Sequence, residues 1–514
     1  MHSAFNSALS SLLSYIQGDG LVILPEMELV LFALGILIFD FLLEKKEKHF
    51  NAYLALLGVA ASAIGLRMQI VKYNALRLNP AGPPGLLGFH NTIMADGFFI
   101  VFAMLFLAAT ALVILLSIRY MDLEHEQEGE YYALILFACT GMMFMASGID
   151  LIVLFLGLEI MALSFYVLSG FLRRNKRSNE AAMKYVLLGA FSSGILAYGF
   201  SLLYGMSAST NVFAIGDMLE RRLRYTFAHG FVDWLVVLAF VTVATGLFFK
   251  VAAVPFHQWA PDVYEGAPTP ITAYISVGSK TASFALLLRL MFYVFGGSHP
   301  TWLYLIAGVA LASLTWGNLA ALTQNNVKRM LAYSSISHVG YILLGLVAWD
   351  PTMQRNTAVT GIFYYLIAYG FMTMGAFAVV IVMRQRGIIG DTLDDLDGLY
   401  QRNPAAALLL LIFMLSLAGI PPTAGFMGKY FIFQALIETH HPILAVFAAL
   451  YIVPALYYYF RVVVHAWMRS PGDAPAPHLT SAQAIALGAT LFVTLAAGLY
   501  PEPFARLARY AFGQ

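Results

Sequence analysis

The chain has 514 residues, of which 60% are hydrophobic and only 11% charged, and its formal net charge is +1 at pH 7. With a mean hydropathy of +0.76, this composition lies far from that of a soluble domain and predicts an integral membrane protein. The absence of a basic patch excludes nucleic acid as a partner, and the single cysteine, Cys139, excludes intrachain disulfides and cysteine-rich metal or cluster sites.

Apolar windows of about 20 residues, the length that crosses a bilayer, recur along nearly the whole chain. We count about fourteen of them by this criterion, which predicts an all-α integral membrane fold with one polytopic domain over 1–514. The longest connections, 73–95 and 207–231, are expected to be loops. The predicted spans are 21–43, 51–72, 96–119, 131–147, 149–172, 181–206, 232–258, 268–296, 301–323, 329–349, 356–384, 404–440, 442–468 and 480–500.

Lysine and arginine concentrate in alternate connections between these spans, at 44–48, 173–177, 328–329 and 384–386. The positive-inside rule places these connections in the cytoplasm and both termini on the periplasmic side of a bacterial inner (plasma) membrane. The run 173–177 is interpreted as a solvated loop, with contact to lipid headgroups as the alternative.

A weak internal repeat relates the two halves of the chain. The segment 165–170 in the fifth span resembles 340–345 in the tenth. An offset of five spans turns one copy upside down relative to the other, as in many secondary transporters. We therefore expect two inverted five-helix repeats, 131–296 (spans 4–8) and 301–468 (spans 9–13).

Prolines interrupt the corresponding seventh and twelfth spans, at Pro255 and at Pro421 and Pro422. Proline removes a backbone hydrogen bond and clashes with the preceding turn, so we expect both helices to break. Broken backbone within a membrane must be satisfied by protein or water. Paired breaks indicate a transport site, and ordinary proline kinks are the alternative.

Four ionisable residues, Glu159, Lys250, Lys280 and Lys429, lie within apolar spans. Lys280 is ten residues beyond Pro270, hence about 15 Å into its helix, near the midplane. Four such charges would cost on the order of 10 kcal/mol if they faced lipid unpaired. A structural salt bridge between Glu159 and Lys250 is one reading of that pair, but it leaves two lysines unexplained. Proton transfer explains them better, because a buried lysine exchanges protons when its surroundings change.

Further polar residues flank these positions. His257 and His338 could relay protons, since imidazole titrates near neutral pH, or be hydrogen-bonded packing residues. Lys184 is expected to extend toward the membrane interface, with a role in proton entry as the alternative. Asp262 and Glu265 are expected to be solvated charges in a polar turn after the seventh span.

The segments 250–270 (KVAAVPFHQWAPDVYEGAPTP) and 419–426 (GIPPTAGF), together with the surroundings of Glu159 and Lys280, resemble the antiporter-like proton channel subunits of respiratory complex I. The resemblance extends over essentially the whole chain. Within this family the N subunits are the most similar, because of Lys429, of the 391–399 loop, and of the absence of a long C-terminal lateral helix.

The resemblance implies a proton-translocating subunit that couples electron transfer from NADH to quinone to proton pumping. It also implies roles for individual residues. Glu159 would pair with Lys250, Lys280 would be the central relay, and Lys429 would face the external half-channel. His338 and Lys184 would be auxiliary relays.

The same resemblance places NADH, FMN, iron–sulfur clusters and quinone in partner subunits, with no cofactor or metal in this chain. The expected partners are the lipid bilayer and other membrane subunits of the complex, including adjacent antiporter-like and small ones. A subunit of a multisubunit sodium/proton antiporter is the alternative, and a structural scaffold with a vestigial channel is a third reading.

Overall fold

The computed structural model describes residues 18–512 except 45–46, 79–82, 125, 127–128, 231, 352–356, 385–389 and 472–475. Four residues of the basic connections, Lys45, Lys46, Gln385 and Arg386, therefore lie outside the described part of the chain.

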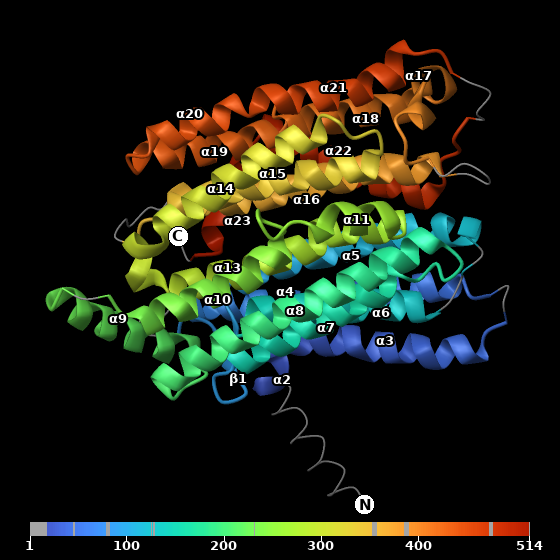
Figure 1. Cartoon of the computed structure of the whole chain (residues 1–514). Coiled ribbons are helices and arrows are strands. Elements are labelled where there is room, and N and C mark those ends of the chain that lie inside the picture. Colours follow the sequence, from blue (N-terminus) through green and yellow to red (C-terminus); the bar gives the residue numbers. More distant parts are fainter. Residues whose placement is uncertain are drawn as a thin grey trace, which may run out of the picture.

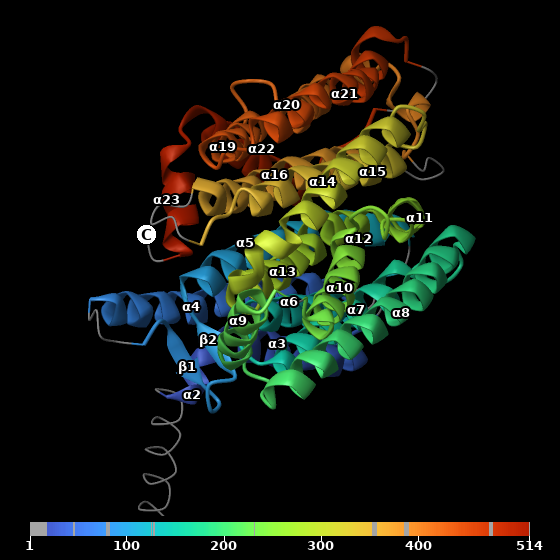
Figure 2. The same cartoon turned by 60° about the vertical axis from the view of Figure 1, so that its left-hand side comes forward.

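The molecule is a bundle of long helices that run side by side, with the N-terminal half of the chain on one side and the C-terminal half on the other (Figure 1, Figure 2). The N-terminal half contains α2 (Asp19–Val22), α3 (Leu24–Leu42), α4 (Phe50–Arg77), β1 (Leu86–Gly88), β2 (Ile93–Ala95), α5 (Gly97–Glu124), α6 (Gly129–Ser147), α7 (Leu151–Ser169), α8 (Lys176–Ser207), α9 (Val212–Ala228), α10 (Trp234–Val251), α11 (Trp259–Gly266), α12 (Thr269–Tyr274), η1 (Ile275–Ser279) and α13 (Lys280–Tyr293).

The C-terminal half contains η2 (Gly296–Ser298), α14 (His299–Ala321), α15 (Val327–Val347), α16 (Thr357–Met383), η3 (Asp394–Leu396), α17 (Leu399–Arg402), α18 (Pro404–Ala418), α19 (Ala424–Glu438), α20 (Pro442–Leu450), α21 (Ile452–Met468), α22 (Ser481–Leu499) and α23 (Glu502–Tyr510).

Each predicted span coincides with a helix or with consecutive helices. The described residues contain 12 helices that are long and apolar enough to cross a membrane. The two predicted spans outside this set are α3, which carries the carboxylates Glu26, Glu28 and Asp40, and the α18–α19 pair, whose halves have 15 residues each. The expected all-α membrane fold is confirmed.

Polar caps set several of the helix starts. The side chain of Asp150 accepts a hydrogen bond from a backbone amide at the start of α7, and Asn326 and Asn403 do the same for α15 and α18. Thr480 and Gln483 form a capping box before α22. Such caps satisfy amides that have no partner within the helix, so they fix where these spans begin.

Burial distinguishes central from peripheral helices. The most apolar window of Thr269–Tyr293 is buried completely, and those of α15 and α16 are 94% buried, whereas that of Pro442–Met468 is only 28% buried. Apolar side chains on the peripheral helices thus face outward, as expected in lipid. The central helices carry the predicted site residues Lys280 and His338.

The connection 207–231, which the sequence suggests to be a loop, is a helix instead. α9 buries Val212, Ile215, Leu219 and Leu223, at helical spacing, and exposes Arg221. An amphipathic helix has a low average hydropathy, so a search for apolar windows does not detect it. It projects at the end of the bundle that also carries β1 and α23 (Figure 1).

The other long connection, 73–95, is also partly regular. α4 continues to Arg77, and β1 and β2 then form a short antiparallel hairpin with Leu87 opposite Met94. Ile93 also bridges to Gly148 just after α6. This hairpin therefore closes one end of the N-terminal half.

Candidate functional site

The predicted break at Pro255 is present. α10 ends where Ala252 adopts a left-handed conformation (φ 61°), and the following Val254–Pro255 peptide bond is cis. The backbone amide of Val254 donates to Ser313 Oγ of α14 at 3.0 Å. A side chain of a neighbouring helix thus satisfies a polar group that the break exposes.

The second predicted break has the same local form. α18 ends at Gly419 (φ 87°), and the Pro421–Pro422 peptide bond is cis. In both breaks the left-handed residue stands three positions before the cis proline. The predicted breaks at Pro255, Pro421 and Pro422 are confirmed.

Lys429 lies across this break from the end of α18. Its side chain is 3% exposed, and Nζ donates to the backbone oxygens of Ala418 at 2.7 Å and Leu417 at 3.4 Å. Nζ also lies 5.0 Å from the centre of the Tyr341 ring. The carbonyl end of a helix and an aromatic face both favour a cation, so the break provides a binding place for an ammonium group.

Lys280 follows a π-helical turn, η1, within the predicted eighth span. Lys280 is 2% exposed, and Nζ donates to the hydroxyl of Ser335 and, at 3.3 Å, to its carbonyl oxygen. The hydroxyl of Tyr369 lies 2.7 Å from Ser335 Oγ and 3.0 Å from Ser276 Oγ in the π-turn. Single π-turns within α-helices are frequent at functional sites.

His338 lies beside this hydrogen-bonded set, with its ring centre 5.3 Å from that of Tyr369. Its Nδ1 lies 2.7 Å from the hydroxyl of Tyr365 and its Nε2 lies 3.2 Å from that of Tyr459. His338 stands three residues after Ser335 and three before Tyr341, so α15 presents all three toward one side. The ring centre of His338 also lies 6.4 Å from that of Tyr341, so a buried row of hydrogen bonds and ring contacts leads from Lys280 past Ser335 and His338 to the aromatic ring beneath Lys429.

The predicted pair of Glu159 and Lys250 is arranged differently. Within the described residues no ion pair of 4.0 Å or less joins them, and Glu159 Oε1 is buried without a hydrogen-bond partner. Lys250 Nζ lies instead 3.5 Å from the hydroxyl of Tyr166. Tyr166 is seven residues after Glu159, about two turns along the same face of α7. The salt-bridge reading of this pair is therefore wrong for this conformation.

Asp262 and Glu265 are not solvated turn charges, contrary to the expectation. They lie on α11, where Asp262 pairs with Lys184 at 2.7 Å and with Arg329 at 2.6 Å, and Glu265 pairs with Arg329 at 3.0 Å. Partial burial raises the pKa of the Asp262 carboxyl, but hydrogen bonds from Lys184 and Arg329 outweigh this effect and hold the pKa below its ordinary value. These residues line a pocket of about 190 Å³.

Lys328, which lies in a predicted basic connection, is a buried cation. Its Nζ donates to the backbone oxygens of Glu265 at 2.9 Å and Ala267 at 2.6 Å, at the end of α11. It stands seven residues before Ser335, hence on the same face of α15. That spacing is the signal in the sequence that could have identified it.

His257 lies at the Pro255 break but outside the buried row. Its ring centre is 6.0 Å from that of Trp316, and its Nδ1 has no hydrogen-bond partner among the described residues. Its predicted role as a proton relay stays a prediction.

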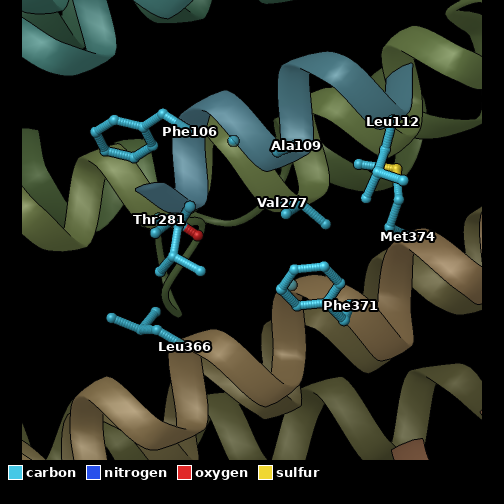
Figure 3. A pocket seen from close by; sticks show the side chains of 11 residues that line it. Phe106, Ala109, Leu112, Val277, Thr281, Leu366, Phe371 and Met374 are labelled. Atoms are coloured by element: carbon cyan, nitrogen blue, oxygen red, sulfur yellow. The ribbon is translucent and has the colours of Figure 1, made fainter. Parts of the chain in front are cut away.

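A small cavity lies beside the π-turn, between α5, α13 and α16 (Figure 3). Its volume is about 10 Å³, and side chains such as Phe106, Val277 and Leu366 line it together with Thr281. Such a volume admits about one water, and a water needs two to four polar partners. The lining is mainly apolar, so this cavity is a packing gap and not a wetted part of the row.

Comparisons with known proteins match the region of the chain that contains these residues. A family model described as "NADH:quinone oxidoreductase/Mrp antiporter, TM" matches residues 148–453, which include both breaks and all four predicted intramembrane charges. The chain is 51% identical over 507 residues to NADH-quinone oxidoreductase subunit N 1 of Koribacter versatilis, covering 98% of this chain and 97% of the relative. It is 49% identical over 501 residues to NADH-quinone oxidoreductase subunit N 2 of Solibacter usitatus, covering 97% and 98%.

Among solved structures, the chain is similar to one chain of respiratory complex I from Thermus thermophilus with bound aureothin. The TM-score is 0.74 at 30% sequence identity, and the match covers 94% of this chain and 98% of the other. The similarity therefore extends over the whole bundle, beyond the region of the family model.

Proposed function

The chain belongs to the NADH:quinone oxidoreductase/Mrp antiporter family, as a subunit N in the proton-translocating membrane arm of NADH-quinone oxidoreductase, and we propose that it moves protons along the buried row described above. The observation that carries this proposal is the buried row between Lys280 and Lys429. Hydrogen bonds join Lys280, Ser335 and Tyr369, and ring contacts join Tyr369, His338 and the Tyr341 ring beneath Lys429.

In this pathway Lys280 is the central proton carrier, and Lys429 is the carrier beside the second break. Glu159 and Lys250 are the corresponding proton carriers beside the first break, with Tyr166 next to the amine. Moving one charge against 100 mV requires about 2.3 kcal/mol. Since modest changes in the pairing of a buried amine supply energy of this size, no large rearrangement of the bundle is needed.

The two halves of the pathway belong to two inverted repeats, 131–296 and 301–468. The matching local form of the two helix breaks supports this assignment, because each combines a left-handed residue with a cis proline three positions later. Inverted repeats with broken helices place transport sites near the middle of the membrane.

The charged pocket of Lys184, Asp262, Glu265 and Arg329 is the proposed proton entry. It lies at the end of the bundle where the basic connections gather, which the positive-inside rule assigns to the cytoplasm. Both termini then lie on the periplasmic side of a bacterial inner membrane. Lys429 would deliver protons to that side.

The redox groups of the enzyme, NADH, FMN, iron–sulfur clusters and quinone, are proposed to lie in partner subunits. These partners include the other antiporter-like and small membrane subunits, with lipid around the remaining surface. In the described part of the chain, one cluster of side chains has the ligand types that bind a metal ion: Asp394, Asp397 and His465. His465 and Arg469 already pair with these carboxylates, which favours an ion cluster without metal.

The sodium/proton antiporter alternative is not carried forward, since relatives near half identity across the full length are N subunits. A scaffold with a vestigial channel is distinguished by experiment. In the purified complex reconstituted into liposomes, Lys280→Ala is expected to abolish proton pumping by this subunit while the complex still assembles. Lys176→Ala, at an exposed lysine, is the control and should pump normally. Normal pumping by Lys280→Ala would contradict the proposal.

A further inference from the structure

A buried carboxyl group lies outside the proposed pathway. Glu26, in the first turn of α3, is 1% exposed, and neither carboxyl oxygen has a hydrogen-bond partner among the described residues. A charged carboxylate buried in this way is costly unless it is paired. Glu26 must therefore hold a proton or a bound cation.

Two polar side chains of α4 donate hydrogen bonds to backbone oxygens of this turn. Ser62 Oγ donates to the carbonyl of Pro25 at 2.9 Å, and Gln69 Nε2 donates to those of Leu21 and Val22 at 2.8 and 2.9 Å. These contacts fix the turn against α4. The Ser62 hydroxyl and the Gln69 amide therefore donate to backbone oxygens and not to the Glu26 carboxyl.

The α6 side of Glu26 offers a hydroxyl group. Ser147, the last residue of α6, lies within interaction range of the carboxyl without a hydrogen bond of ordinary geometry. Its Oγ has no other partner among the described residues. A protonated carboxyl would donate to this oxygen, whereas an ionised one would accept its hydrogen.

The charged groups around this turn do not neutralise Glu26. Arg289, on α13, is committed to Asp96 at 3.1 and 3.2 Å and to the carbonyl of Ala146 at 2.9 Å. On α4 the basic residues are exposed, and on α6 the single charged residue is exposed as well. The other acids of α3 are Glu28, which lies beside α4, and Asp40, which lies at the far end of α3. The exposed residues are Arg67, Lys72 and Arg77 on α4 and Glu130 on α6.

A metal cation fits this site poorly. Hard cations such as Ca²⁺ and Mg²⁺ take six or more oxygen ligands. Among the described residues, the unpartnered side-chain oxygens of α3 and of the polar groups around its first turn are both of Glu26, Glu28 Oε2, Gln69 Oε1 and Ser147 Oγ, fewer than such a shell requires. A proton needs only one oxygen acceptor besides the carboxyl, which the Ser147 hydroxyl provides.

A set of polar side chains extends from this site toward the centre of the bundle. Cys139 lies buried on α6 about two turns before Ser147, and the Tyr274 hydroxyl donates to the backbone oxygen of Ile135, one turn before Cys139, at 3.4 Å. The hydroxyls of Thr110 and Tyr274 are 2.7 Å apart. Tyr274 ends α12, directly before the π-turn that precedes Lys280.

We propose that Glu26 is a further proton-binding residue of this subunit, connected through Cys139, Thr110 and Tyr274 to the π-turn at Lys280. Its protonation does not depend on the lysine pathway being correct. Its connection to Lys280 does rest on that proposed function, so the two parts are tested separately.

Isotope-edited infrared spectroscopy of the intact purified complex tests the first part. The wild-type spectrum minus that of Glu26→Gln should contain a carbonyl band of a protonated carboxyl that shifts in deuterated water. The matched difference for Glu130→Gln, an exposed carboxylate, should lack such a band. Absence of the band for Glu26→Gln, or its loss when sodium ions are added, would overturn the assignment. Glu26→Asp keeps the carboxyl and should retain a displaced band if Glu26→Gln does not assemble.

Proton pumping in liposomes tests the second part. Glu26→Gln and Tyr274→Phe should each lower the number of protons moved per quinone reduced, while Glu130→Gln should not. Unchanged pumping in Glu26→Gln would remove the connection to Lys280. Loss of pumping in Lys280→Ala together with unchanged pumping in Glu26→Gln would contradict only this inference and leave the proposed function standing.

Discussion

Lys429 Nζ lies 2.7 Å from the backbone oxygen of Ala418, the last residue of the helix on the other side of the proline break. In a continuous helix that oxygen would accept from the backbone amide four residues later, but here the residues four positions after Leu417 and Ala418 are Pro421 and Pro422, which have no amide hydrogen. At the break, the ammonium group of Lys429 therefore takes the place of a backbone donor. The hydrogen bonding of the end of α18 then depends on whether Lys429 is protonated.

Lys429→Met should lower both stability and pumping. It leaves the carbonyls of Ala418 and Leu417 without their donor, at a cost of about 1–3 kcal/mol for a buried unsatisfied group. Thermal unfolding of the complex and pumping in liposomes would measure the two effects. Lys176→Met, at an exposed lysine, is the control; an equal response of both variants would show that the contact is unimportant.

Gly419→Ala should displace the same ammonium group. Gly419 has φ 87°, and an added Cβ would lie 2.9 Å from Lys429 Nζ. A left-handed conformation alone costs a non-glycine residue roughly 1–2 kcal/mol. We expect a lower melting temperature and weaker pumping. Gly194→Ala is the matched control, because nothing lies within 4 Å of its added Cβ in α8; equal effects of the two substitutions would contradict the argument.

The breaks and the four ionisable residues within apolar spans could be predicted because prolines and ionisable residues inside apolar windows are strong signals in one dimension. The hydroxyls that join them could not. Ser335, Tyr365 and Tyr369 look like ordinary packing residues in apolar helices, and their function arises only where α13, α15 and α16 meet.

Other features were missed because the expected signal was absent. The π-turn before Lys280 contains no proline. Lys328 stands beside Arg329 in what looks like a basic connection, although only its position on the face of Ser335 and His338 makes it buried. Asp262 and Glu265 look solvated until α8 and α15 bring Lys184 and Arg329 against them.

Tyr369→Phe should interrupt the row without removing a charge. The change deletes the hydroxyl that lies within hydrogen-bond distance of Ser335 and Ser276, while the ring can still pack. We expect assembly and quinone reduction to persist with fewer protons pumped per quinone. Tyr198→Phe, at a half-exposed tyrosine on α8, should have no effect. Full pumping by Tyr369→Phe would mean that protons bypass this hydroxyl.

Asp262→Asn should make the complex less stable at neutral pH but not in acid. Hydrogen bonds from Lys184 and Arg329 outweigh partial burial and keep the pKa of Asp262 below its ordinary value of 3.8. A carboxyl with a lowered folded pKa stabilises the protein above its unfolded pKa, and the contribution disappears as the pH falls through the folded pKa. Because these groups are about one-third exposed, the effect should be at most about 1 kcal/mol.

Thermal unfolding of the wild type and of Asp262→Asn, followed from neutral pH into acid, would measure this contribution. The difference between the two should shrink as Asp262 of the wild type becomes protonated. Glu180→Gln is the control, because Glu180 also pairs with Lys184 at 2.7 Å but its side chain is 64% exposed and solvent screens the pair. If Glu180→Gln destabilised the protein as much as Asp262→Asn, solvent exposure would not determine the strength of these ion pairs. Asp262 would then be no more important than Glu180 in the proposed proton entry.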